Sequence, residues 1–152
     1  MKEKEIIKEA KSLTKRHHLF TYILAKLFGK SQIIDYFFLF YAYCRQVDDV
    51  VDASDIPYEK KLSILSQQQQ LVELLYRSEI SKQEYLRNSF NKFLYLFIQF
   101  DRKYQNVLKD SITGLLNIFL FDLKRRRKLP INSVMMDFFK REAIATMRLI
   151  YF

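Results

Sequence analysis

Two aspartates one helical turn apart are the residues of this sequence best placed to do chemistry. Asp48 and Asp52 lie in the string YAYCRQVDDVVD, and their i,i+4 spacing puts both carboxylates on one face of a helix. Like charges at that spacing repel each other, and a divalent cation would offset the repulsion. Mg²⁺ prefers carboxylate oxygens and completes its coordination with water and substrate phosphates. The pair therefore predicts a Mg²⁺ site that serves a phosphate-bearing substrate.

Three neighbouring residues extend this candidate site. Asp49 adds a third acid, Arg45 lies three residues before Asp48, and Tyr41 lies one turn before Arg45. A guanidinium can bind phosphate oxygens through two parallel hydrogen bonds. A simpler interpretation is an acidic helix end in which Arg45 forms an ion pair with Asp48 or Asp49, because short acidic patterns recur by chance.

The longer string that contains the acids resembles the first aspartate-rich motif of the squalene/phytoene synthase family, the head-to-head prenyltransferases. That motif reads approximately Y-A-x-C-R-x-[VI]-D-D-x-x-D, and the chain matches it at Tyr41, Ala42, Cys44, Arg45, Val47, Asp48, Asp49 and Asp52. The resemblance implies that Asp48 and Asp52 bind Mg²⁺ bridged to a prenyl diphosphate. It further implies that Arg45 and Tyr41 contact the diphosphate, that Asp48, Asp52 and Arg45 act in catalysis, and that Asp49 belongs to the substrate-binding residues.

A second similarity lies downstream. The segment ITGLLNIFLFDLKRRRKLP resembles the family helix in which small residues precede an Asp-Leu pair and basic residues, with Gly114 and Asp122 at the glycine and the acid. The resemblance adds Asp122 to the substrate-binding residues. Nothing after Asp122 matches the family's second motif, of D-x-x-x-D type, and Asp137 stands alone there. We therefore expect residues 1–152 to form a single, incomplete domain that covers the N-terminal part of the family fold.

Composition and helix signals predict an all-α fold. The 152 residues include only 2 Gly and 2 Pro, too few for the turns of a β-sandwich or barrel. Hydrophobic residues make up 49%, enough for a packed core. Apolar periodicity, capping residues and the two prolines predict helices over residues 4–17, 19–28, 32–53, 58–77, 81–100 and 102–126, and one from about 132. The resemblance implies a helical bundle like the N-terminal half of the isoprenoid synthase fold.

The numbers of Cys and His residues exclude some kinds of site, and the lengths of the apolar segments favour one cellular location. Cys44 is the only cysteine, which excludes an internal disulfide and a Cys-based zinc site, and His17 and His18 are the only histidines. The apolar run Ile33 to Cys44 is shorter than the ~18 residues that span a bilayer, so we expect a buried core helix. The charged N-terminal segment does not resemble a signal peptide. These features favour a cytoplasmic location.

The chain is strongly basic, with 26 Lys and Arg against 17 Asp and Glu. Such a balance suits anionic partners: phosphate-bearing substrates, a membrane surface or nucleic acid. The run KRRRK at residues 124–128 is either a solvated helix end or a contact for anionic lipid headgroups, which leaves peripheral membrane association open. No aromatic residues alternate with side chains suited to base contacts, so we expect no nucleic-acid partner.

The function implied by the resemblance is Mg²⁺-dependent head-to-head condensation of two prenyl diphosphates, such as farnesyl or geranylgeranyl diphosphate, in isoprenoid, carotenoid or hopanoid biosynthesis. Phe37, Phe38 and Phe40 would line an apolar cavity or pack in the core. With one aspartate motif, we expect the chain alone to bind substrate without converting it, and to associate through an exposed apolar face at Met135 to Phe152. The alternatives are a non-catalytic or split-enzyme helical module that binds prenyl diphosphate or a partner chain, and a basic helical protein that binds nucleic acid.

Overall fold

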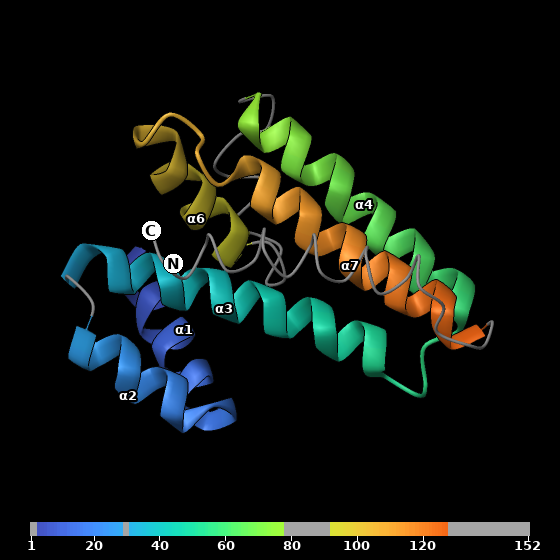
Figure 1. Ribbon diagram of the computed structural model, residues 1–152, viewed down its shortest axis with the longest axis horizontal. Coiled ribbons are helices and arrows are strands. Elements are labelled where there is room, and N and C mark those ends of the chain that lie inside the picture. The colour runs from blue at the N-terminus through green and yellow to red at the C-terminus, as the bar shows by residue number, and fades with distance from the viewer. Residues whose placement is uncertain (1–2, 29–30, 78–91, 128–152) are drawn as a thin grey trace, which may run out of the picture.

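The computed structural model of the chain describes residues 3–28, 31–77 and 92–127. Within these ranges it contains no strand and consists of the helices α1 (Glu3–His17), α2 (Leu19–Phe28), α3 (Ser31–Asp52), α4 (Tyr58–Tyr76), α6 (Lys92–Lys103) and α7 (Lys109–Arg127). α3 runs through the middle, with α1 and α2 on one side of it and α4 and α7 on the other (Figure 1). The prediction of an all-α fold is confirmed.

The central position of α3 follows from its sequence. Its 22 residues include apolar side chains on almost every face, which is typical of a helix surrounded by others. Accordingly, α3 contacts each of the other described helices. Its fully or nearly fully buried side chains are Phe38, Leu39, Ala42, Tyr43, Val47 and Val51. The helix that carries the candidate site is therefore the one held most firmly by the rest of the bundle.

α1 packs against α3 through a stripe of buried residues one turn apart, Ile6, Ala10 and Thr14. The Thr14 hydroxyl donates a 2.9 Å hydrogen bond to the carbonyl oxygen of Ala10, which satisfies it inside the core. Glu3 and Glu5 lie in the first turn of α1 and basic residues in its last, an arrangement that complements the helix dipole. An ion pair between Lys11 and Asp35, 2.5 Å long, fixes α1 to the N-terminal part of α3.

α2 begins directly after α1 and is held by few contacts. The imidazole of His18 caps its start, because the Thr21 hydroxyl lies 2.6 Å from His18 Nδ1 and the Thr21 backbone N–H donates to the same atom. Tyr22 stacks on Phe38 of α3. Five apolar side chains of α2 are exposed to solvent: Leu19, Phe20, Ile23, Leu24 and Leu27. α2 therefore presents an apolar outer surface.

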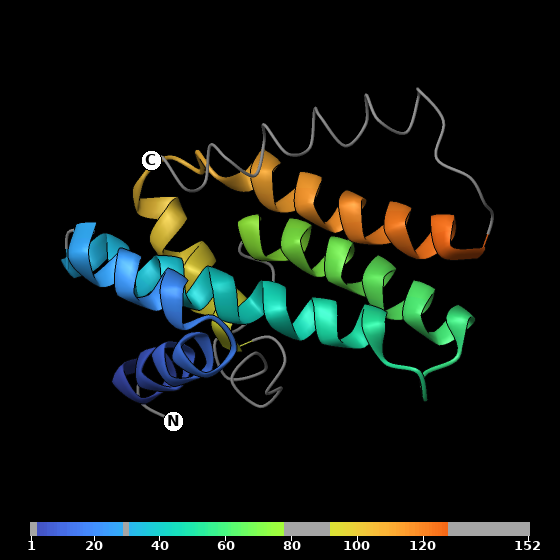
Figure 2. The same cartoon turned by 60° about the horizontal axis from the view of Figure 1, so that its bottom comes forward.

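α4 and α7 lie side by side and run in opposite directions (Figures 1 and 2). Pro57 stands at the N-cap of α4 and ends the short connection from α3, as expected for a residue without an N–H. Gln69 on α4 donates a 2.8 Å hydrogen bond to Asn117 on α7, and Lys109 forms a 3.1 Å ion pair with Glu73. The two helices thus cover the C-terminal half of α3 as a pair.

The boundary between α6 and α7 differs from the prediction. A helix was expected to begin at Arg102, whereas α6 continues to Lys103 and α7 begins only at Lys109. Gln105 and Asn106 both have positive φ angles, of 64° and 61°, which no α-helix contains. The helix starts predicted at residues 81 and 132, and the apolar face predicted for residues 135–152, lie outside the described residues.

A membrane-spanning segment was not expected, and the structure agrees for the part of the chain that it describes. None of the helices there combines the length and the apolar character needed to cross a bilayer. The apolar run Ile33 to Cys44 lies inside α3, where it supplies much of the core.

Candidate functional site

The last three turns of α3 carry the residues that the sequence singled out. Tyr41, Arg45, Asp48, Asp49 and Asp52 follow one another along this helix, which ends at Asp52. The helix end is closed by α4, whose Lys61 ammonium donates a 2.7 Å hydrogen bond to a carbonyl oxygen of the last turn. The acidic residues therefore project from a rigid helix end rather than from a loop.

Arg45 forms ion pairs with two of the three acids. Its Nη1 donates to Asp48 Oδ2 over 3.0 Å, and its Nη2 donates to Asp49 Oδ1. The hydrogen bond that Arg45 donates to Asp49 raises the pKa of the Arg45 guanidinium, which stays charged at every accessible pH. This is the ion pairing that the simpler interpretation of the acidic helix end predicted. It leaves both interpretations standing, because a phosphate-binding arginine also needs anionic neighbours to hold it in place.

Arg45 also keeps hydrogen-bonding capacity in reserve. Its Nε is buried and has no hydrogen-bond partner, while the side chain as a whole is 33% exposed. A buried N–H without an acceptor is costly, and such atoms are uncommon away from functional sites. Tyr41, one turn earlier, is partly buried; burial raises the pKa of its hydroxyl, which therefore remains a neutral donor. The helix thus offers several donors beside the acids.

The residues present fit Mg²⁺ as part of a shared site rather than of a protein cage. Among the described residues, no three His, Cys, Asp or Glu side chains come together as a metal-binding group. Asp48 and Asp52 supply carboxylates from one helix, which matches the way Mg²⁺ takes one or two carboxylates and leaves its other positions to water and phosphate. The unpartnered Nε of Arg45 beside these acids suits an anionic group that such an ion would carry.

Asp122, the remaining predicted site residue, lies on α7. Its Oδ1 accepts hydrogen bonds from Arg125 Nε over 3.0 Å and from Arg125 Nη2 over 2.7 Å. Both groups of this pair are more than two-thirds buried. Its place among the substrate-binding residues remains a prediction.

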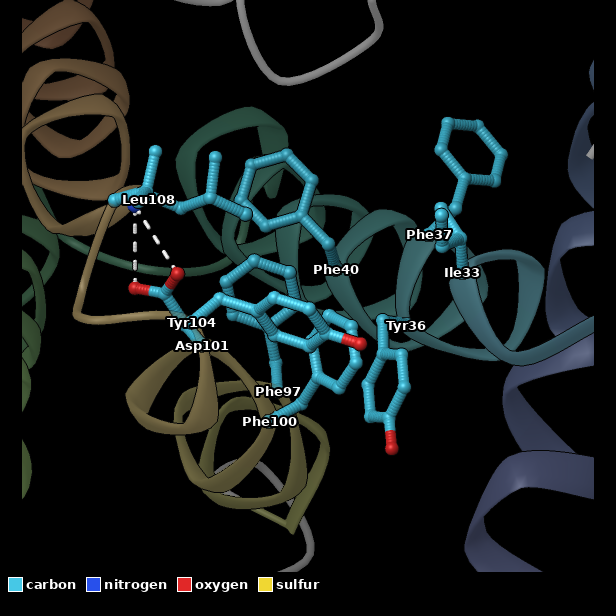
Figure 3. A pocket seen from close by; sticks show the side chains of 10 residues that line it. Ile33, Tyr36, Phe37, Phe40, Phe97, Phe100, Asp101, Tyr104 and Leu108 are labelled. Carbon is cyan, nitrogen blue, oxygen red and sulfur yellow. Dashed lines mark hydrogen bonds between the residues drawn. The ribbon is translucent and has the colours of Figure 1, made fainter. Parts of the chain in front are cut away.

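Sequence reasoning did not predict the aromatic pocket that the described residues form where α3 meets α6. The pocket encloses about 280 Å³. Figure 3 shows rings from both helices converging on it. Its lining residues are Ile33, Tyr36, Phe37, Phe40, Phe97, Phe100, Asp101, Tyr104, Val107 and Leu108. Of the three phenylalanines expected in a cavity or in the core, Phe37 and Phe40 line this pocket, whereas Phe38 is fully buried in the core.

A buried carboxylate holds one wall of this aromatic pocket. Asp101 is 1% exposed and accepts a 2.7 Å hydrogen bond from the Tyr76 hydroxyl. It also accepts a 3.1 Å hydrogen bond from the Leu108 backbone N–H (Figure 3). Burial raises the pKa of Asp101, and the hydrogen bonds from Tyr76 and Leu108 offset part of that rise. The sequence offered one signal for it, an acid that follows the largely apolar run Phe93 to Phe100.

The pocket and the acidic helix end share α3. Residues four apart form adjacent rows on a helix, and two such rows run from the pocket to the acids. One row is Ile33, Phe37, Tyr41, Arg45 and Asp49, and the other is Tyr36, Phe40, Cys44, Asp48 and Asp52. At 1.5 Å per residue, the axial rise from Phe40 to Asp48 is about 12 Å. Apolar and charged surfaces therefore follow each other along one helix.

Comparison with known proteins identifies the family. A family model described as squalene/phytoene synthase matches residues 15–139, most of the chain. No curated protein and no solved structure matches it. The family is one of all-α transferases of isoprenoid biosynthesis that join prenyl diphosphates head to head, in agreement with the helical fold. The chain belongs to the squalene/phytoene synthase family.

Proposed function

We propose that the chain binds a prenyl diphosphate at the C-terminal end of α3, with Mg²⁺ held by Asp48 and Asp52 and with Arg45 and Tyr41 on the phosphate oxygens. The observation that carries this proposal is the position of an aromatic pocket and an acidic helix end on one unbroken helix. A substrate with a charged head and an apolar tail, such as farnesyl or geranylgeranyl diphosphate, requires both kinds of surface.

The reaction of the family begins when the C–O bond of an allylic diphosphate breaks and the diphosphate leaves with the electron pair. Mg²⁺ held by Asp48 and Asp52 would supply positive charge for the leaving group. Arg45 and the neutral Tyr41 hydroxyl donate hydrogen bonds to the same oxygens. The aromatic pocket, whose Phe40 lies about 12 Å along the helix axis from Asp48, takes the apolar tail of the substrate. The double bond of a second prenyl diphosphate attacks the allylic cation, and loss of a proton closes the cyclopropane ring of the product diphosphate.

Substrate contact by Asp122 and membrane contact by residues 124–128 are two further proposals. Asp122 would contact substrate only if its pair with Arg125 opens. Membrane contact through residues 124–128 would use Lys124, which is exposed, whereas Arg125 is engaged by Asp122. Only the substrate contact depends on the opening of this ion pair, and Asp122→Asn, which removes the carboxylate, tests that contact in the binding assay.

The test of the proposed function is binding of labelled farnesyl diphosphate to the pure chain, with Mg²⁺ and with a chelator. We expect Mg²⁺-dependent binding without product, because the described residues supply one aspartate pair and the loss of a single preorganised contact commonly costs ~10²–10³ in rate. Binding that ignores Mg²⁺ and survives Asp48→Asn would overturn the proposal. Condensation product from this chain alone would show that further acids, Asp122 or Asp137, complete the metal site.

A further inference from the structure

We propose that Arg45 couples the binding of Mg²⁺ to the binding of the diphosphate by exchanging partners. In the ligand-free protein its guanidinium is shared between Asp48 and Asp49; when the cation binds Asp48, the guanidinium leaves that carboxylate and takes phosphate oxygens instead. This inference rests on the proposed function for the identity of the two ligands.

The first step in the argument is that one carboxylate serves two cations. Arg45 Nη1 lies 3.0 Å from Asp48 Oδ2, so the proposed metal ligand already has a positive partner. Arg45 stays charged, since its hydrogen bond to Asp49 raises its pKa. Mg²⁺ and a charged guanidinium repel each other at one carboxylate. Cation binding at Asp48 therefore weakens the Arg45–Asp48 ion pair and favours movement of the guanidinium.

The second step is that the geometry allows this movement. The two terminal nitrogens of Arg45 each contact a different acid, so Asp48 can be released while the contact with Asp49 remains. The side chain of Asp49 is 50% exposed and that of Arg45 33%, which leaves room for the head group to turn outward. The buried Nε marks the part of the side chain that stays fixed. Asp49 is thus a positioning residue that retains Arg45 beside the site.

The third step is the balance of charge. The helix end brings two cations, Arg45 and Lys61, against three aspartates, so an anionic diphosphate is repelled until a divalent ion has bound. Once the ion is present, the displaced guanidinium becomes available to phosphate oxygens. Its bonds to these oxygens are stronger than its bond through one N–H to an exposed carboxylate. By thermodynamic linkage, each ligand must raise the affinity of the other by the same factor.

The experiment measures metal affinity by calorimetry in the intact chain, first with Mg²⁺ alone and then with saturating inorganic phosphate. For the unaltered chain we expect phosphate to tighten Mg²⁺ binding by about tenfold, within the usual range of coupling between two sites. In Arg45→Gln we expect tighter binding of Mg²⁺ alone and little or no further gain from phosphate. In Arg45→Lys, which keeps the charge but not the fork, we expect weak Mg²⁺ binding as in the unaltered chain and a reduced gain.

Lys109→Gln is the matched control, because Lys109 also forms an ion pair with a carboxylate, that of Glu73, and the change in net charge is identical. It should leave both affinities and their coupling unchanged. Equal phosphate coupling in the unaltered chain and in Arg45→Gln would overturn the exchange while leaving the proposed function intact. A chain that binds no Mg²⁺ with or without phosphate would instead overturn the proposed function itself. If Arg45→Gln does not fold by circular dichroism, Arg45→Lys decides, since undiminished coupling in that variant also overturns the exchange.

Discussion

Asp48 and Asp52 are placed so that their removal should cost function and not structure. We expect Asp48→Asn and Asp52→Asn to abolish Mg²⁺-dependent binding of prenyl diphosphate with helix content unchanged. The reason is that removing one of two like charges at i,i+4 relieves repulsion, and that partly exposed ion pairs such as Arg45–Asp48 contribute about 0–1 kcal/mol. Circular dichroism and the binding assay check this together. Loss of folding in either variant, with binding retained by the folded fraction, would contradict it.

Asp101 should make stability depend on pH in a defined direction. Its pKa in the folded chain is raised above the ordinary aspartate value of 3.8, so the neutral acid is the form that the fold favours. Its contribution to the free energy of unfolding is therefore complete below that value and is lost as pH rises through the raised pKa. Asp101→Asn imitates the neutral acid and should lack this loss. Urea unfolding at several pH values should show that the free energy of unfolding of the unaltered chain falls relative to that of the variant as pH rises through the raised pKa. If the two free energies change in parallel with pH, the assignment is contradicted.

The two aspartate sites differ in how far the sequence could predict them. Asp48 and Asp52 share a helix, so their spacing alone places them together, and the ion pair of Arg45 follows from the same local rule. The partners of Asp101 are Tyr76, which lies 25 residues earlier, and a backbone N–H beyond the end of its helix. Such contacts depend on how helices pack, and no local pattern in the sequence encodes them. The aromatic pocket was missed for the same reason.

At the scale of elements, the connection between α6 and α7 is the place where backbone conformation is costly. Gln105 adopts a left-handed conformation with φ of 64°, which costs a residue with a Cβ about 1–2 kcal/mol. Gln105→Gly should therefore raise the free energy of unfolding by about 1 kcal/mol, and chemical denaturation measures it. The matched change inside α6, Gln99→Gly, should lower that free energy by about 1 kcal/mol. A loss of stability in both variants would contradict the strain at Gln105.

The predicted boundaries of α1 to α4 agree with the structure to within one residue. For α3 and α4, which were predicted over 32–53 and 58–77, Pro57 helps to mark the separation. Between α6 and α7 there is neither Gly nor Pro, and the break is made by positive φ angles and by hydrogen bonds to Asp101. Without either residue to mark the break, the sequence predicted a helix from Arg102 that continues through it.

At the scale of the whole molecule, the outer surface of α2 should make the chain associate. Five of its apolar residues are between 37% and 70% exposed: Leu19, Phe20, Ile23, Leu24 and Leu27. Contiguous apolar surface of this kind usually leads to contacts between molecules. The association predicted from residues 135–152 lies outside the described structure, and α2 offers a second cause.

We expect the double variant Phe20→Lys, Leu27→Lys to shift the chain toward monomer in sedimentation velocity. Leu74→Lys on α4, also an exposed apolar residue, is the control and should not. A monodisperse monomer of the unaltered chain at high concentration would contradict the expectation.

The all-α class itself followed from composition, because few Gly and Pro leave little but long helices. The sequence indicated the central position of α3 only through apolar residues on every face of the helix. Such a pattern does not tell which other helices pack against it.

The continuity of α3 limits how this protein can change in evolution. Because pocket and acids occupy the same helix, inserting one residue between Phe40 and Asp48 would turn one group by about 100° relative to the other. Their relation would be lost even though no side chain had been replaced. Insertions or deletions of about one turn would preserve the shared face and change the separation by about 5–6 Å. We therefore expect relatives that accept longer or shorter substrates to differ from this chain in one of two ways. The segment between the pocket and the acids changes by whole helical turns, or its length stays the same and the aromatic rings of the pocket change in size.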